Sequence, residues 1–190
     1  MNVSKETNRR MKKVNIAGII SLLIFSFVKI NSDPLLYSLL DIITGVISIY
    51  LLLYLISILQ FAHESVSVQN PFSIFLGLEV VRLVGIFFAE SAASLLSGIG
   101  IIELIIMIYI LIATFKIKSD KFARPFQIFG ILLILATAAK ICLVFGFMGR
   151  GNELISLYIN LMGMLPLLAI FYIIRQTGKY LQNIQTTVIS

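Results

Sequence analysis

The chain has 190 residues, of which 59% are hydrophobic and only 13% are charged, and its formal net charge is +6. This composition excludes an ordinary soluble domain, in which charged residues approach a quarter of the total. A span of a bilayer needs about 20 predominantly apolar residues, so the length allows roughly six spans and no separate soluble domain.

Long apolar runs follow one another along the chain and predict an all-α integral membrane protein, a bundle of about six transmembrane helices. Helices are expected because in hydrocarbon only helices or closed barrels satisfy every backbone group, and the runs are too long for barrel strands. Pro34 follows Asp33 and Pro71 follows Asn70, and a polar residue followed by proline is typical of a helix start. Pro125 opens another run. No small-residue cleavage site follows the first run, which predicts a retained span rather than a signal peptide. The predicted spans are residues 14–30, 35–61, 72–91, 95–116, 126–148 and 153–175.

The turn between the third and fourth spans has two candidate positions. Equal span lengths favour residues 90–94, whereas the glycines in residues 97–100 favour a later turn, because glycine breaks helices. Small residues also recur at every fourth position here, and this spacing lets helix backbones approach closely. The stripe predicts either a contact between protomers or packing within one protomer. If all four small residues lie on one continuous helix, that helix extends through Ser97, which favours the later turn. Its members are Gly85, Ala89, Ala93 and Ser97.

Lysine and arginine are distributed unevenly between the predicted loops, and such residues accumulate on the cytoplasmic side of a membrane. With both termini in the cytoplasm, the opposite loops contain only Lys29 and Arg150. We therefore predict a protein of the bacterial cytoplasmic (inner) membrane with both termini on the cytoplasmic side. The positive charge is expected to orient the chain and to contact the lipid bilayer, and not to bind nucleic acid. The chain then divides into a basic arm at 1–13, a transmembrane bundle at 14–177 and an amphipathic cytoplasmic tail at 178–190. The basic residues of the cytoplasmic side are Lys5, Arg9, Arg10, Lys12, Lys13, Lys116, Lys118, Lys121, Arg124, Arg175 and Lys179.

Ionisable residues occur inside the predicted spans, where a charge costs roughly 2.5–3.5 kcal/mol at the bilayer centre. Glu79 and Arg82 are three residues apart, so they share one helix face and can pair. With the earlier turn, Arg82, Glu103 and Lys140 reach a similar depth and predict a polar layer; with the later turn the layer disappears. The functional interpretation is a water-filled vestibule or an ion-coupling site, and the alternative is a set of interhelical pairs that fix packing. The predicted polar network comprises Asp41, Glu79, Arg82, Glu90, Glu103, Lys140 and Asn160.

Proline inside the sixth span predicts a kink between Gly163 and Pro166, either static or acting as a hinge, because proline removes one amide from the helix. One histidine, His63, and one cysteine, Cys142, predict no metal site and exclude an internal disulfide. No cofactor motif occurs in the sequence, so we expect no cofactor.

Two functions are compatible with these patterns. The first is a non-enzymatic membrane subunit that forms a homo-oligomer and anchors or senses for a cytoplasmic protein partner through the basic face and the C-terminal tail. Small membrane subunits of bacterial signalling or phage-defence complexes have a similar layout, which is an analogy of layout alone. The second function is an ion channel or small-solute transporter that uses the intramembrane charges. We expect no enzyme, because the chain lacks the aspartate runs and paired histidines of small membrane enzymes.

Overall fold

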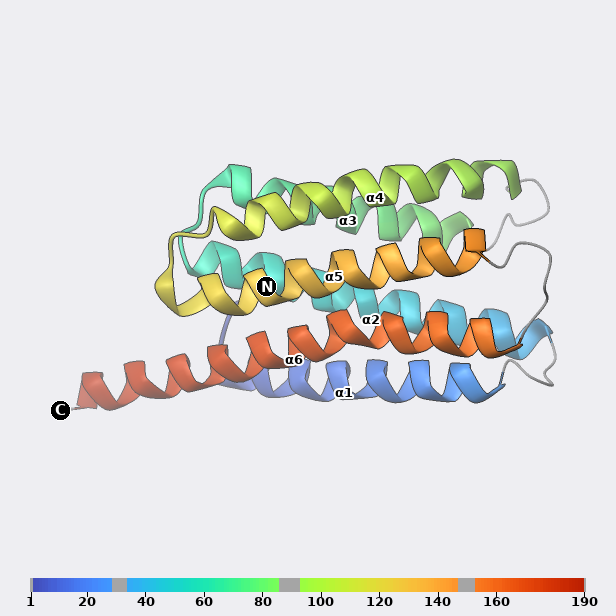
Figure 1. The fold of residues 1–190 in the computed structure, drawn as a ribbon. Coiled ribbons are helices and arrows are strands. Elements are labelled where there is room, and N and C mark those ends of the chain that lie inside the picture. The colour runs from blue at the N-terminus through green and yellow to red at the C-terminus, as the bar shows by residue number, and fades with distance from the viewer. Residues whose placement is uncertain (1, 29–33, 86–92, 147–152, 190) are drawn as a thin grey trace.

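The computed structural model describes residues 2–28, 34–85, 93–146 and 153–189. Within these ranges all regular structure is helical, which confirms the predicted all-α class for the described part of the chain (Figure 1). The helices are α1 (Lys5–Val28), α2 (Pro34–Phe61), α3 (Val66–Gly85), α4 (Ala93–Phe115), α5 (Asp120–Gly146) and α6 (Glu153–Ile189).

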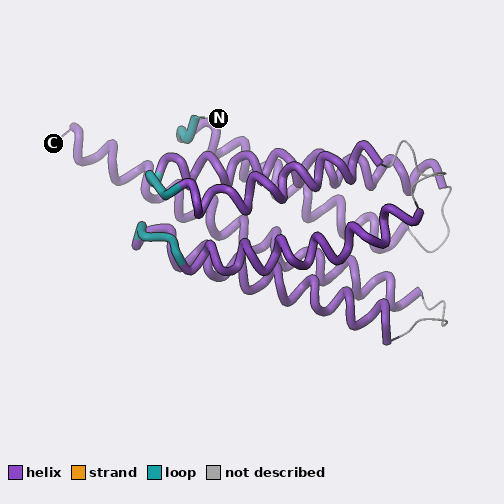
Figure 2. Tube along the Cα trace, turned by 90° about the horizontal axis from the view of Figure 1, so that it is seen from above, coloured by secondary structure: helices purple, strands orange, loops and turns teal. Residues whose placement is uncertain are grey.

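The six helices run alongside one another and close into a ring. Each helix packs against its neighbours in the chain, and α6 returns to pack against α1. One end of the bundle carries both chain ends and the connections at residues 62–65 and 116–119, and we call it the termini end (Figure 1 and Figure 2). The last turns of α6 project beyond the other helices there. The opposite end is called the far end below.

Large apolar side chains are exposed on all six helices. Val81, Ile105 and Leu168 retain 59%, 61% and 50% of their accessible surface, respectively. A soluble protein rarely exposes so much contiguous apolar surface, whereas lipid solvates it. Three described helical segments are long and apolar enough to cross a membrane: Leu39–Phe61, Asp120–Ala139 and Leu161–Ile184. These features are those of a helical membrane protein, while the number of six spans and the side of the termini stay predictions.

A cluster of buried aromatic side chains lies toward the termini end. Phe72 of α3 packs edge-on against Phe126 of α5, with ring centroids 5.9 Å apart, and stacks on Phe129 at 6.2 Å. Tyr54 of α2 is fully buried, and its hydroxyl donates a hydrogen bond to Oδ1 of Asn8 on α1 at 2.7 Å. Together these residues fill the ring at its termini end and join α1, α2, α3 and α5.

Three helices, α1, α3 and α5, begin directly after a serine, and α3 and α5 begin before their prolines. The carbonyls of Ser65 and Ser119 accept hydrogen bonds from first-turn amides of α3 and α5, and Ser4 accepts in the same way at the start of α1. Pro71 and Pro125 each lie six residues after the capping serine, inside the helix. The predicted starts at these prolines are therefore wrong by more than one turn. Proline is tolerated at these positions because its missing amide leaves one carbonyl without a hydrogen-bond donor, and this carbonyl belongs to an exposed residue near the helix start.

The chain reverses between Gly85, the last residue of α3, and Ala93, the first residue of α4. The later turn is wrong, because residues 97–100 lie inside α4. Glycine alone does not end this helix, and glycine is common within membrane helices. Gly85 and the pair Ala93 and Ser97 therefore belong to different helices and do not form one continuous stripe, while Ala89 lies outside the described residues.

Gly130 allows α5 to approach α4 closely. A Cβ atom at Gly130 would lie 2.7 Å from Oγ1 of Thr114, whose hydroxyl donates to the carbonyl of Leu111. A Cβ at Gly77 on α3 would meet nothing within 4 Å. We expect Gly130→Ala to lower the free energy of unfolding by about 1–3 kcal/mol through overpacking, and Gly77→Ala to preserve or slightly raise it. Thermal unfolding of both variants in detergent checks this, and equal stability would contradict a close approach at Gly130.

Candidate functional site

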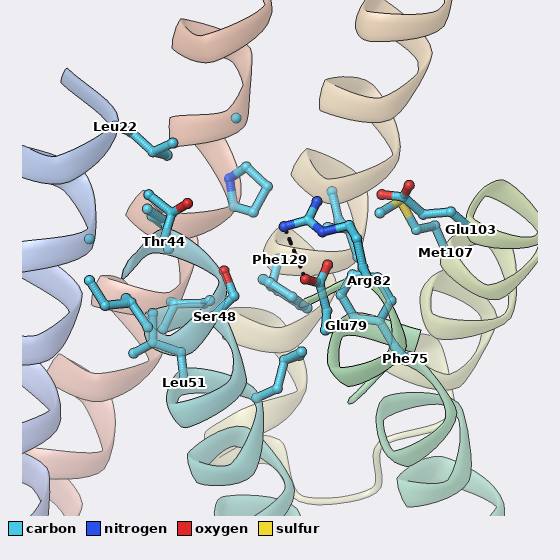
Figure 3. A pocket seen from close by; sticks show the side chains of 18 of the residues that line it. Leu22, Thr44, Ser48, Leu51, Phe75, Glu79, Arg82, Glu103, Met107 and Phe129 are labelled. Atoms are coloured by element: carbon cyan, nitrogen blue, oxygen red, sulfur yellow. Dashed lines mark ion pairs between the residues drawn. The ribbon is translucent and has the colours of Figure 1, made fainter. Parts of the chain in front are cut away.

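A cavity of about 230 Å³ lies inside the ring, between the aromatic core and the far end (Figure 3). We call it the central cavity. All six helices contribute to its wall, so it depends on closure of the whole ring rather than on one pair of helices. One wall residue from each helix, in chain order, is Gly18, Asp41, Glu79, Glu103, Phe129 and Pro166.

The inward faces of α2 and α3 are apolar toward the termini end and polar toward the far end. On α2, Asp41, Thr44 and Ser48 line the cavity at helical spacing, and Leu51 follows one turn later at the edge of the core. On α3 the direction is reversed, because Phe75 precedes Glu79. The ring is therefore closed by apolar packing at one end and lined by polar groups beyond it.

Two oppositely charged side chains of α3 pair in this wall. The Nη2 atom of Arg82 lies 3.2 Å from Oε2 of Glu79, as their spacing in the sequence predicts. Glu79 is buried, whereas 38% of the Arg82 side chain is accessible. Figure 3 shows both side chains directed into the space between α2, α4 and α5. The pair therefore places a partly accessible guanidinium in the middle of the cavity.

Among the described residues of the cavity wall, negative charges outnumber positive charges. Its described acidic residues are Asp41, Glu79 and Glu103, from three different helices, and its described basic residue is Arg82. The hydroxyl of Thr44 donates within its own helix to the carbonyl of Asp41 at 2.9 Å. With all four groups ionised, the wall attracts a cation.

The remaining members of the predicted polar network lie outside the described side chains. Lys140 and Asn160 belong to α5 and α6, but their side chains are beyond the part that the structure describes, and Glu90 falls in the undescribed segment 86–92. Gly163 and Pro166 do line the cavity, and α6 is one helix through both positions. The kink itself stays a prediction.

Asn15 of α1 is a polar residue next to the cavity that sequence reasoning did not identify. It is fully buried, and its Nδ2 donates to the carbonyl of Leu167, a wall residue that follows Pro166, at 3.2 Å. Its Oδ1 has no hydrogen-bond partner among the described groups. A sequence signal existed, because Asn8 and Asn15 are seven residues apart and therefore share one helix face.

Glu64 is a second residue whose role the sequence did not reveal. Its carboxylate is buried and accepts hydrogen bonds from the backbone amides of Lys118 and Ser119, the shortest of them 2.8 Å long. Its backbone carbonyl accepts a hydrogen bond from Nε2 of Gln69 at 2.7 Å. Glu64 thus links the connection between α2 and α3 to the start of α5 at the termini end.

His63 precedes this residue and lies in the turn that follows α2. Its φ angle of 55° is left-handed, its amide donates to the carbonyl of Gln60, and the amide of Glu64 donates to the carbonyl of Leu59. This is the Schellman arrangement that commonly terminates a helix. The conformation of His63 therefore has a structural explanation, and it directs Glu64 toward α5.

Within the described ranges, no three His, Cys, Asp or Glu side chains gather closely enough to hold a metal ion. No protein-family model, curated protein or solved structure matches the chain.

Proposed function

We propose that the protein is a six-span, non-enzymatic transporter or channel for a small organic cation, with both termini in the bacterial cytoplasm. The observation that carries this proposal is a closed ring of helices around a cavity whose described wall contains three carboxylates and one guanidinium. Ionisable groups in membrane helices are costly, and they commonly mark solute or ion pathways. The central cavity is the binding site in this proposal.

Charge and lining indicate the class of solute. Asp41 and Glu103 add two negative charges to the Glu79–Arg82 pair, so a positively charged solute compensates the wall. A bare metal ion is a poorer match, because the described acidic residues do not converge on one point. An organic ammonium ion also has an apolar body, which suits a wall that includes Phe75 and Phe129. The volume of 230 Å³ exceeds the roughly 150 Å³ that accommodates benzene in an engineered protein cavity.

Movement of α6 against α1 is the proposed route by which the cavity opens. Pro166 has no amide, so the carbonyl of Met162 lacks its helical partner and α6 is weakened beside the cavity. The hydrogen bond from Asn15 to the carbonyl of Leu167 joins α1 to α6 one residue further along. Breaking this bond while α6 bends would open the seam between α1 and α6 without disturbing the aromatic core.

Uptake by purified protein in liposomes tests the proposal. We expect proteoliposomes to accumulate a small amine such as ethylammonium above protein-free liposomes, and a neutral amide of similar size to give no such difference. Glu103→Gln is expected to lower amine uptake several-fold, because it removes a negative charge from the wall, whereas Arg82→Gln removes the opposing positive charge and should preserve or raise amine uptake. Full uptake by the Glu103→Gln variant, or no uptake by the wild type, would contradict the proposal.

A membrane anchor or sensor subunit is the second candidate function. It is supported by the last turns of α6, which project past the ring at the termini end and bear Asn183 and Ile184 on their exposed surface (Figure 1). In this alternative the protein forms a homo-oligomer and the projecting turns bind a cytoplasmic protein. Purification from native membranes in mild detergent separates the two candidates: a stoichiometric soluble partner supports the subunit, and an isolated protein that takes up amines contradicts it.

A further inference from the structure

A second concavity lies on the seam between α5 and α6 at the termini end, remote from the central cavity. We call it the seam groove. Lys121 of α5 and Lys179 of α6 line it from opposite sides, and both are exposed. The described residues of its wall include no acid. The other residues that line it are Phe122, Gln176, Tyr180, Asn183 and Ile184.

Aromatic contacts fix Tyr180 in the seam groove and hold the ammonium group of Lys121 beside it. The ring of Tyr180 contacts Phe61 and Phe122 edge-on, with centroids 6.1 and 5.8 Å apart, so it is fixed between α2 and α5. The Nζ atom of Lys121 lies 4.1 Å from the centroid of the Tyr180 ring, a cation–π contact. The ammonium group is therefore held at the groove instead of extending into solvent.

The seam groove is continuous with the lipid-facing side of α6. Leu161, Leu168 and Arg175 recur every seven residues and are exposed, and Lys179 continues the same helix face four residues later. Lys179 lies eleven residues from Leu168, about 16 Å along the helix axis. Half of a hydrocarbon core is about 15 Å thick. A lipid whose acyl chains cover Leu168 would thus place its headgroup at the level of the two lysines.

We propose that the seam groove binds the phosphate headgroup of an anionic phospholipid of the same leaflet. Lys121 and Lys179 neutralise the phosphate, and the amide of Gln176 is placed to donate a hydrogen bond to a phosphate or glycerol oxygen. The acyl chains lie along the same face of α6, on its exposed residues Leu161 and Leu168. Basic pockets between membrane helices on the cytoplasmic side are suited to such headgroups by charge and by depth. This inference does not depend on what the central cavity binds.

Native mass spectrometry of the full chain tests the proposal after reconstitution in nanodiscs of equimolar phosphatidylglycerol and phosphatidylcholine. We expect the released wild-type protein to retain phosphatidylglycerol in preference to phosphatidylcholine. Replacing both lysines, Lys121→Gln with Lys179→Gln, is expected to reduce that preference by about fivefold or more. The charge-preserving pair Lys121→Arg with Lys179→Arg should retain it, which separates loss of the headgroup contact from misfolding.

The matched control is Lys116→Gln with Lys118→Gln, which removes the same charge from exposed positions at the same end, outside the seam groove. Preserved lipid preference in this control supports a defined site, whereas an equal loss would show diffuse attraction and overturn the proposal. Excess inorganic phosphate distinguishes the source of the phosphate group. If it displaces phosphatidylglycerol completely, the groove binds free anions and the lipid assignment is refuted.

Discussion

Replacing Glu64 by alanine is expected to lower the free energy of unfolding by about 2–4 kcal/mol. The Glu64 carboxylate is buried and accepts hydrogen bonds from the amides of Lys118 and Ser119 directly before α5. Alanine would leave these donors without their partner and would remove a negative charge from the positive end of the α5 dipole. Because Glu64 joins the α2–α3 connection to the start of α5, the loss is expected to loosen the closed end of the ring.

Thermal unfolding in detergent measures this effect, and two further variants define its cause. Glu64→Gln retains one carbonyl acceptor, so its stability should lie between those of the wild type and the alanine variant. Glu6→Ala removes a carboxylate from an exposed pair with Arg10 within α1 and should leave the stability essentially unchanged. A Glu64→Ala protein as stable as the Glu6→Ala protein would refute the role assigned to the carboxylate.

The sequence was sufficient to predict the helices but not all of their starts. The run at residues 35–61 corresponds closely to α2 (Pro34–Phe61), because a long apolar segment has no other way to satisfy its backbone in lipid. Ser65 and Ser119 were not predicted as helix starts because Pro71 and Pro125 are stronger start signals in the sequence. A proline at the sixth position of a helix is nevertheless tolerated where the carbonyl that loses its amide donor belongs to an exposed residue near the helix start.

The cavity residues were only partly within reach of sequence reasoning. Asp41, Glu79, Arg82 and Glu103 stand out as charges in apolar runs, and the structure places all four at one cavity. These four residues share one cavity because α6 closes the ring against α1, and no local sequence pattern predicts the contact between α6 and α1. Glu64 was unrecognised for the same reason, because a polar residue in a short connection is ordinarily solvated and its partners are more than fifty residues away.

The central cavity is expected to discriminate between reagents by charge. Ser48 lies in the cavity wall, and Cys142 is the only native cysteine, so Ser48→Cys in a Cys142→Ser background provides a single reporter thiol. At about 10 Å in water, one unit charge changes the energy of another by about 0.4 kcal/mol. An excess of two negative charges therefore separates a cationic from an anionic reagent by about 1.6 kcal/mol, or roughly fifteenfold in rate.

Labelling of that thiol in lipid nanodiscs by cationic and anionic methanethiosulfonates tests the central cavity most directly. We expect the ratio of the cationic to the anionic rate to exceed the ratio for a free thiol in solution by about tenfold or more. The control position is Gly77, exposed on the outside of α3, where Gly77→Cys should label slowly with both reagents because a thiolate does not form in hydrocarbon. A Ser48→Cys thiol that labels with the solution ratio, or that is as unreactive as the Gly77→Cys thiol, would contradict a water-filled, negatively charged cavity inside the ring.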